Sequence, residues 1–136
     1  MLRYLAAALL GALLWAGPAA AAPYGDAGVA MSVAGVECAP EAGGERCAVT
    51  VRLVDISDGV TVFDEQEQVA YDAAGRAFRP DPGATAAANT GPVTRRLPRG
   101  EPVSSVLVYR LPPGSRIDRL VLHGNIGSPG ETFTVR

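Results

Sequence analysis

The sequence predicts an all-β protein, an antiparallel sandwich or barrel of about seven to eight strands. Apolar and polar residues alternate with a period of two in several short runs. Turn signals that contain Gly, Pro and Asp separate these runs roughly every ten residues. No segment has the length and the single apolar stripe of an amphipathic helix, so we expect sheets to form the core.

The first two predicted strands surround the two cysteines. The residues that share the inward phase of these strands are Val29, Met31, Val33, Cys47, Val49, Val51 and Leu53. Successive side chains of a strand point to opposite faces, so Thr50 and Arg52 are expected on the outer face. The Ser57-Asp58-Gly59 sequence then turns the chain.

The middle of the chain predicts short strands joined by tight turns. Residues 60–63 and 68–71 are two such strands, and residues 72–76 form a hairpin turn into a third. Residues 80–83 contain two prolines and end that strand. Residues 84–89 have helix propensity. Because Pro-Gly precedes them and Thr-Gly-Pro follows, we favour a surface crossover or a short strand there.

The last third of the chain has the clearest alternation. The inward residues predicted here are Val103, Leu107, Tyr109, Leu111, Leu120, Leu122, Phe133 and Val135. Ser105 is a polar exception to this phase, and Arg110 falls on the opposite face. A slip of one residue would place Arg110 in the core, which fixes the expected register.

The first 21 residues have the order of a secretory signal peptide. Arg3 precedes an apolar run over residues 5–15, and small residues follow up to Ala21. The run is shorter than the about 20 residues that a membrane span needs. We expect cleavage after Ala21 and a mature domain over residues 22–136. No cysteine lies at the cleavage site, so the domain is expected to be soluble, extracytoplasmic and free of a membrane anchor.

The mature chain is one domain of 115 residues with a slightly acidic charge. It carries eleven arginines, no lysine and fourteen acidic residues, a net charge of −3. No basic stripe is present, which argues against nucleic acid as a partner.

Cys38 and Cys47 are the only cysteines of the chain. Two cysteines in an oxidising compartment normally pair, so we predict an intramolecular disulfide. A metal site or a reactive thiol is the alternative, but no histidine lies near them in the sequence.

The sequence offers little for catalysis or for metal binding. His123 is the only histidine, and we expect it at a strand end, facing solvent. A zinc site would need His123 together with carboxylates, because both cysteines are expected to pair. No Gly-x-Ser-x-Gly elbow accompanies the serines. We therefore expect no cofactor, no metal and no enzymatic activity.

One acidic cluster, Asp64, Glu65 and Glu67, leaves two interpretations open. Calcium binds six to eight oxygens, and carboxylates supply them in many extracellular loops. The spacing of these residues fits no known calcium loop, so a solvated loop between strands is the favoured interpretation.

Several stretches match one known family. They are residues 29–38 and 47–58, Tyr71-Asp-Ala-Ala-Gly-Arg-Ala-Phe, Leu97-Pro-Arg-Gly-Glu-Pro-Val, Leu107-Val-Tyr-Arg-Leu-Pro-Pro-Gly and Leu120-Val-Leu-His-Gly. Over residues 28–135 the chain resembles a secreted bacterial immunoglobulin-like domain family of unknown function. That family is common in actinobacterial and firmicute exported proteins, and it is similar in fold to the mycobacterial immunoprotective extracellular antigens. The chain departs from the family in residues 84–96 and between the two cysteines, where it is shorter.

The resemblance implies an immunoglobulin-like antiparallel β-sandwich and no catalytic residues. Such sandwiches bind partners through loops and edge strands, so we expect a non-enzymatic module for a protein or a cell-envelope component. The candidate surface comprises Arg95, Arg96, Arg99, Asn125 and Ile126. The alternative is a protease inhibitor that presents Arg95 or Arg99 to a trypsin-like pocket.

Overall fold

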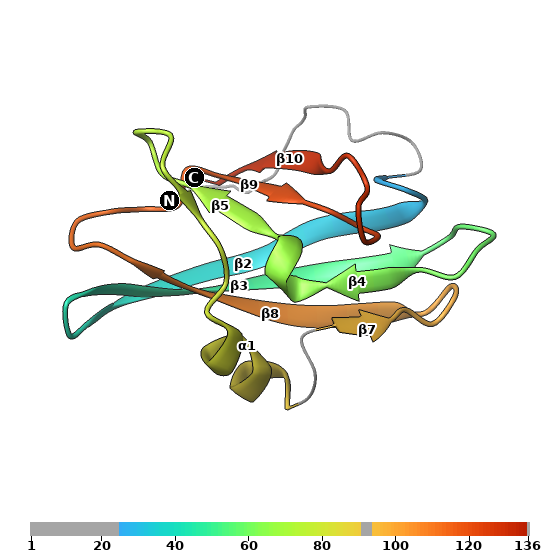
Figure 1. Cartoon of the computed structure of the whole chain (residues 1–136), viewed down its shortest axis with the longest axis horizontal. Coiled ribbons are helices and arrows are strands. Elements are labelled where there is room, and N and C mark those ends of the chain that lie inside the picture. Colours follow the sequence, from blue (N-terminus) through green and yellow to red (C-terminus); the bar gives the residue numbers. More distant parts are fainter. Residues whose placement is uncertain (1–24, 91–93, 136) are drawn as a thin grey trace, which may run out of the picture.

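The computed structural model describes residues 25–90 and 94–135, so the predicted signal peptide lies outside the described residues. Most of these residues belong to antiparallel sheets (Figure 1). One sheet has the strand order β2-β3-β8, a second has the order β10-β9-β5-β6, and β4 pairs with β7. The prediction of an all-β protein is therefore confirmed.

The described strands are β2 (Val29–Glu41), β3 (Gly44–Asp55), β4 (Val62–Asp64), β5 (Val69–Tyr71), β6 (Ala77–Phe78), β7 (Thr94–Arg96), β8 (Pro102–Leu111), β9 (Arg119–Leu122) and β10 (Glu131–Thr134). A 3-10 turn, η1 (Glu65–Glu67), follows β4. These nine strands of the described ranges exceed the seven to eight that were predicted. The strand that the sequence did not indicate is β7, which is only three residues long, too short for a repeating pattern.

A β-bulge makes β2 longer than its sequence pattern indicates. The register between β2 and β3 shifts between Val33 and Gly35. Before the shift, Val29 and Met31 face the core; after it, Val36 lies opposite Val49. The bulge inserts one extra residue into β2. Odd-numbered side chains therefore face the core before the bulge and even-numbered side chains face it afterwards, so the inner face stays apolar.

The predicted disulfide between Cys38 and Cys47 is present. The two cysteines lie directly opposite each other on β2 and β3, with 4.0 Å between their Cα atoms. Both strands belong to one sheet, so the bond closes a hairpin. The conserved disulfide of antibody domains, by contrast, joins two sheets.

The core is formed by side chains from both larger sheets and from β4. Its fully buried members include Val51, Leu53, Phe63, Leu107, Tyr109, Leu120 and Leu122. Phe133 and Val135 are half-buried and pack against this cluster. The Tyr109 hydroxyl donates to the Gln68 carbonyl at 3.0 Å, which satisfies the polar tip of the ring, and burial raises the pKa of Tyr109.

Residues 82–89 form an α-helix, α1 (Pro82–Asn89), on the connection between β6 and β7, so the expectation of a short strand over residues 84–89 is wrong. The Asp81 carboxylate caps the helix by accepting the Ala84 N–H at 3.0 Å. Pro82 occupies the first turn, where its missing N–H costs nothing. No helix of residues 25–90 and 94–135 is long and apolar enough to cross a membrane.

Candidate functional site

The acidic cluster after β4 is partly buried, so its interpretation as a solvated loop is wrong for Glu65. The Glu65 side chain is fully buried. Its Oε2 accepts a hydrogen bond from Arg95 Nη2 at 2.8 Å and another from the Ser105 hydroxyl. Asp64 caps η1 by accepting the Gln66 N–H at 2.9 Å. The cluster therefore anchors η1 and β7 to β8.

Nowhere in the described ranges do three or more His, Cys, Asp or Glu side chains gather closely enough to hold a metal ion. Glu65 is directed at a guanidinium, and Glu67 Oε1 accepts the Gly127 N–H at 3.2 Å. The carboxylates of the predicted cluster thus serve separate partners.

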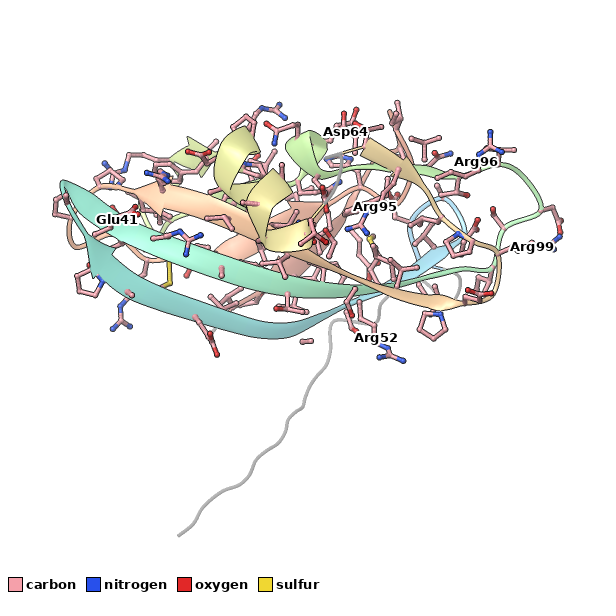
Figure 2. All side chains as sticks on the ribbon, turned by 90° about the horizontal axis from the view of Figure 1, so that it is seen from below. Glu41, Arg52, Asp64, Arg95, Arg96 and Arg99 are labelled. Atoms are coloured by element: carbon pink, nitrogen blue, oxygen red, sulfur yellow. A yellow bond between two sulfur atoms is a disulfide. The ribbon has the colours of Figure 1, made fainter. Side chains whose placement is uncertain are left out.

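The three candidate arginines lie in different surroundings. Arg95 points into the molecule, and its side chain is only 27% exposed (Figure 2). Arg96 is exposed on β7. Arg99 lies on the loop after β7 and pairs with Asp58 at 2.9 Å, with both side chains in solvent. Arg95 is thus a structural residue, and only Arg96 and Arg99 remain for a partner.

The candidate loop between β9 and β10 is fixed by the buried carboxylate of Asp26. One oxygen, Oδ2, accepts the Gly124 N–H at 2.8 Å and the Ser128 hydroxyl. The other, Oδ1, accepts the Gly130 N–H at 3.0 Å. Charge-assisted bonds of this kind are about twice as strong as neutral ones. This loop is therefore held at both of its ends.

The same loop is joined to β4 through its tip. Asn125 Oδ1 accepts the Val62 N–H at 2.9 Å, and the Ile126 N–H donates to the Val62 carbonyl at 2.9 Å. The Ile126 side chain is not used in these contacts and is 49% exposed. Of the two candidates here, Asn125 fixes the loop and Ile126 is presented to solvent.

A second loop, residues 56–61, is organised by Asp55. The buried Asp55 carboxylate accepts the Ser57 N–H at 2.9 Å and the Ser57 hydroxyl at 2.7 Å. Ser57 Oγ lies 3.1 Å from Thr61 Oγ1, which ties the two ends of the loop together. Burial alone raises the pKa of Asp55, but the bonds from Ser57 and Thr61 and the charge of Arg99 lower it below its usual value.

A third loop, residues 97–101, is bonded to the second. The Leu97 N–H donates to the Thr61 carbonyl at 2.9 Å, and the Gly100 N–H donates to the Asp55 carbonyl at 2.7 Å. Figure 1 shows these two loops together at the right-hand end of the sheets. We call residues 56–61, 97–101 and 123–130 the loop end.

The exposed large apolar side chains of the described residues are Ile56, Val60 and Ile126, and all three lie in the loop end. They are 47%, 65% and 49% exposed. Sequence reasoning identified Ile126 and missed Ile56 and Val60. Both could have been identified from the sequence, because they are aliphatic residues beside the polar Ser57-Asp58-Gly59 turn.

His123 and Ser128 of the loop end meet Asp26 without the geometry of a catalytic triad. His123 directly follows β9, as predicted, but it is half-buried. Its Nδ1 lies 2.7 Å from the Ser128 carbonyl oxygen, whereas the Ser128 hydroxyl donates to Asp26. A triad needs the imidazole at the serine hydroxyl. The three side chains therefore fix the loop.

A cavity of about 510 Å³ lies at the opposite end of the three-stranded sheet. Its lining includes Glu41, Glu45, Phe78, Arg110 and Pro113, and no serine, histidine or cysteine. Figure 2 shows Glu41 at this end and Arg99 at the other. The charged groups of this lining are the carboxylates of Glu41 and Glu45 and the guanidinium of Arg110.

Comparison of the chain with protein-family models, with curated proteins and with solved structures finds no match.

Proposed function

We propose that this chain is a secreted, non-enzymatic immunoglobulin-like module that binds another protein through its loop end. The observation that carries the proposal is the position of Ile56, Val60 and Ile126, which are exposed on neighbouring loops at one end. Single exposed apolar residues are normal on a protein surface, whereas a group of them marks an interaction site.

The rigidity of the three loops supports this role. Asp26 and Asn125 hold loop 123–130, and Asp55 holds loop 56–61, through side-chain bonds to backbone N–H groups. Loop 97–101 is held by its backbone N–H groups, which donate to the carbonyls of Thr61 and Asp55. A surface whose shape is fixed before binding loses less conformational entropy when the partner arrives. The buried carboxylates therefore favour a preformed interface.

The chemistry of the loop end favours a protein as the partner. Its exposed apolar side chains are aliphatic, whereas sugar-binding sites rely on aromatic platforms. Arg99 is offset by Asp58, so the surface lacks the unpaired cations that phosphates attract. Aliphatic residues with a charged rim resemble the centre and the border of a protein–protein interface.

The immunoglobulin-like assignment and secretion belong to the same proposal. Two antiparallel sheets that share one core, and the resemblance over residues 28–135, support the fold. The Cys38–Cys47 disulfide and the signal-like residues 1–21 support export to an oxidising compartment.

Site-specific photocrosslinking tests the proposed surface. A photoreactive residue placed at Ile126 is expected to capture one envelope or extracellular protein, and the same residue at exposed Ala87 is the matched control. Ile126→Asp should abolish binding of the captured protein, whereas Ala87→Asp should leave it unchanged. Equal capture at both positions, or binding that survives Ile126→Asp, would reject the loop end as the interface.

Protease inhibition is the second candidate function, and Arg99 is the observation that favours it. The Arg99 side chain is 63% exposed on a loop whose backbone is bonded to Asp55. An inhibitor needs such a fixed, exposed side chain for the specificity pocket of its protease. Arg95 is unsuitable, because it is directed at Glu65.

Titration of trypsin with the purified protein decides between the two functions. Inhibition that disappears in Arg99→Ala and persists in Arg96→Ala would support the inhibitor. Full trypsin activity in the presence of excess protein would exclude this candidate.

A further inference from the structure

The two edges of the three-stranded sheet are protected in different ways. The β2 edge contains a bulge at residues 33–35, Pro40 and two glutamates, all of which hinder pairing with another strand. The β8 edge is regular, because its register with β3 runs without a shift over ten residue pairs. Regular edge strands rich in β-branched residues attract other strands.

Helix α1 occupies the outer edge of β8 (Figure 1). The side chain of Asn89 exchanges two hydrogen bonds with Val106: Nδ2 donates to the carbonyl at 2.7 Å, and Oδ1 accepts the N–H at 2.8 Å. In an antiparallel ladder, a residue of a neighbouring strand makes this same pair of bonds.

Val108 is the next residue of β8 whose backbone N–H and carbonyl point away from β3, and both groups are hydrogen-bonded in a similar way. Its N–H donates to Thr85 Oγ1 at 3.0 Å, and its carbonyl accepts the Asp81 N–H at 2.7 Å. Residues 106 and 108 are the alternate positions at which a fourth strand would bond. Residues of α1 and its N-cap thus make the hydrogen bonds that two residues of a neighbouring strand would make.

The contact between α1 and β8 depends on these polar bonds, since the helix supplies little apolar area. No side chain of α1 is a large apolar one, and only Thr85 is buried. Hydrogen bonds to a strand edge can be exchanged for those of another strand with a small net change in free energy.

We propose that α1 is a strap over a latent self-association edge: while attached it keeps β8 closed, and its detachment lets a second copy of this chain pair through β8. This inference is independent of the loop end.

The residues of β8 are compatible with antiparallel pairing against β8 of a second copy. In an antiparallel pairing centred on Val108, that residue faces itself, and Val106 faces Arg110 of the other copy. β-branched pairs stabilise such a ladder, and no two like charges lie opposite each other. The product is a continuous sheet of two symmetrically paired halves.

The test removes the side-chain hydrogen bonds of the strap and measures mass. Thr85→Val together with Asn89→Ala deletes the side-chain bonds to Val106 and Val108 while keeping the shape of residue 85. Light scattering over a range of concentrations should give the mass of one chain for the native protein and of two chains for this variant. Ala87→Ser with Ala88→Ser, on the exposed side of α1, is the matched control and should stay at one chain.

Amide hydrogen exchange reports the edge itself. At low concentration the Val106 and Val108 amides of the double variant should exchange about tenfold faster than in the native protein, and the core amide of Val49 should stay protected. If exchange accelerates but the mass stays at one chain at every concentration, the edge takes no second copy. Unchanged exchange would show that α1 is no strap.

A third substitution locates the interface. Val106→Lys added to the double variant should restore the mass of one chain, because a charge on an edge strand opposes pairing. A dimer that persists would use another surface and would overturn the proposal. Faster exchange of the Val49 amide in the double variant would mean that its core is disturbed. In that case Asn89→Ala alone is measured in the same way and must give the dimer.

Discussion

The Arg95 guanidinium and the Glu65 carboxylate form a buried ion pair, with Arg95 Nη2 at 2.8 Å from Glu65 Oε2. The two residues lie 30 positions apart, on β7 and η1. The Ser105 hydroxyl, on β8, donates to the same oxygen. The Glu65 carboxylate therefore joins three elements of the fold.

Arg95→Ala is expected to destabilise the protein by about 3–5 kcal/mol, because it leaves the buried Glu65 charge without its partner. Urea unfolding of the purified variant gives the free energy of unfolding. The double variant Glu65→Leu/Arg95→Ala should recover most of that loss, since it removes both charges. A double variant as unstable as the sum of its two single variants would show that the pair does not act as a unit.

Glu131→Gln is expected to raise the free energy of unfolding at neutral pH. Burial and the neighbouring charge of Asp26 raise the pKa of Glu131 above its usual value. The folded state thus binds the proton of Glu131 more tightly than the unfolded state does. This proton binding stabilises the folded state fully at pH values below the unfolded pKa, and the stabilisation is lost as the pH rises through the folded pKa. Glutamine resembles the protonated form at every pH.

Urea unfolding across pH 4–8 measures this effect. The difference between Glu131→Gln and the native protein should widen as the pH rises. The exposed Glu101→Gln is the matched control and should follow the native curve. A variant less stable than the native protein at pH 7 contradicts the assignment.

Removal of the Cys38–Cys47 bond is expected to cost about 2–3 kcal/mol through the regained entropy of a ten-residue loop in the unfolded chain. Cys38→Ala/Cys47→Ala can be compared with the native protein by thermal unfolding. Mass spectrometry of unreduced protein should show a loss of about 2 Da relative to the dithiol. Two free thiols in protein recovered from the medium would contradict the assigned pairing.

Leu107→Ala is expected to destabilise the protein by about 2–5 kcal/mol, because it removes a fully buried side chain and leaves a cavity. Arg110→Ala should cost less than about 1 kcal/mol, since the Arg110 side chain is 54% exposed and solvent screens its pairs with Asp81 and Glu41. Urea unfolding of the two variants compares them directly. A larger effect for Arg110 would mean that the facing of β8 is wrong.

Protein collected from the medium is expected to begin at Ala22 or Pro23. The apolar run and the small residues that follow it match the cleavage pattern of exported proteins. N-terminal sequencing measures this directly. An exported form that stays on the membrane with Met1 intact would contradict the signal-peptide prediction.

The inward faces of β3, β8 and β9 could be predicted from the sequence, because alternation in a strand is local. Val51, Leu107 and Leu122 are all fully buried on the predicted phase. The phase of β2 beyond Val33 could not be predicted, because the bulge exists only in register with β3. Helix α1 had a readable start in Asp81-Pro82, but its flanking prolines and glycines also fit a loop.

The candidate site was predicted only in part. Ile126 and Arg99 are exposed in the loop end, as expected of an interaction surface, whereas Arg95 is directed at Glu65. A sequence gives no sign that two charges 30 residues apart will meet inside a protein. The roles of Asp26 and Asp55 were equally hidden, because a carboxylate that fixes a loop looks like any other acidic residue.

The sequence by itself determined the phases of β3, β8 and β9, the turns, the paired cysteines and the all-β class, since each depends on neighbours along the chain. Only the tertiary structure decided that Glu65 is buried, that α1 closes the β8 edge and that three loops meet at one end. These are contacts between distant segments, and their free energy exists only once the sheets have brought the segments together.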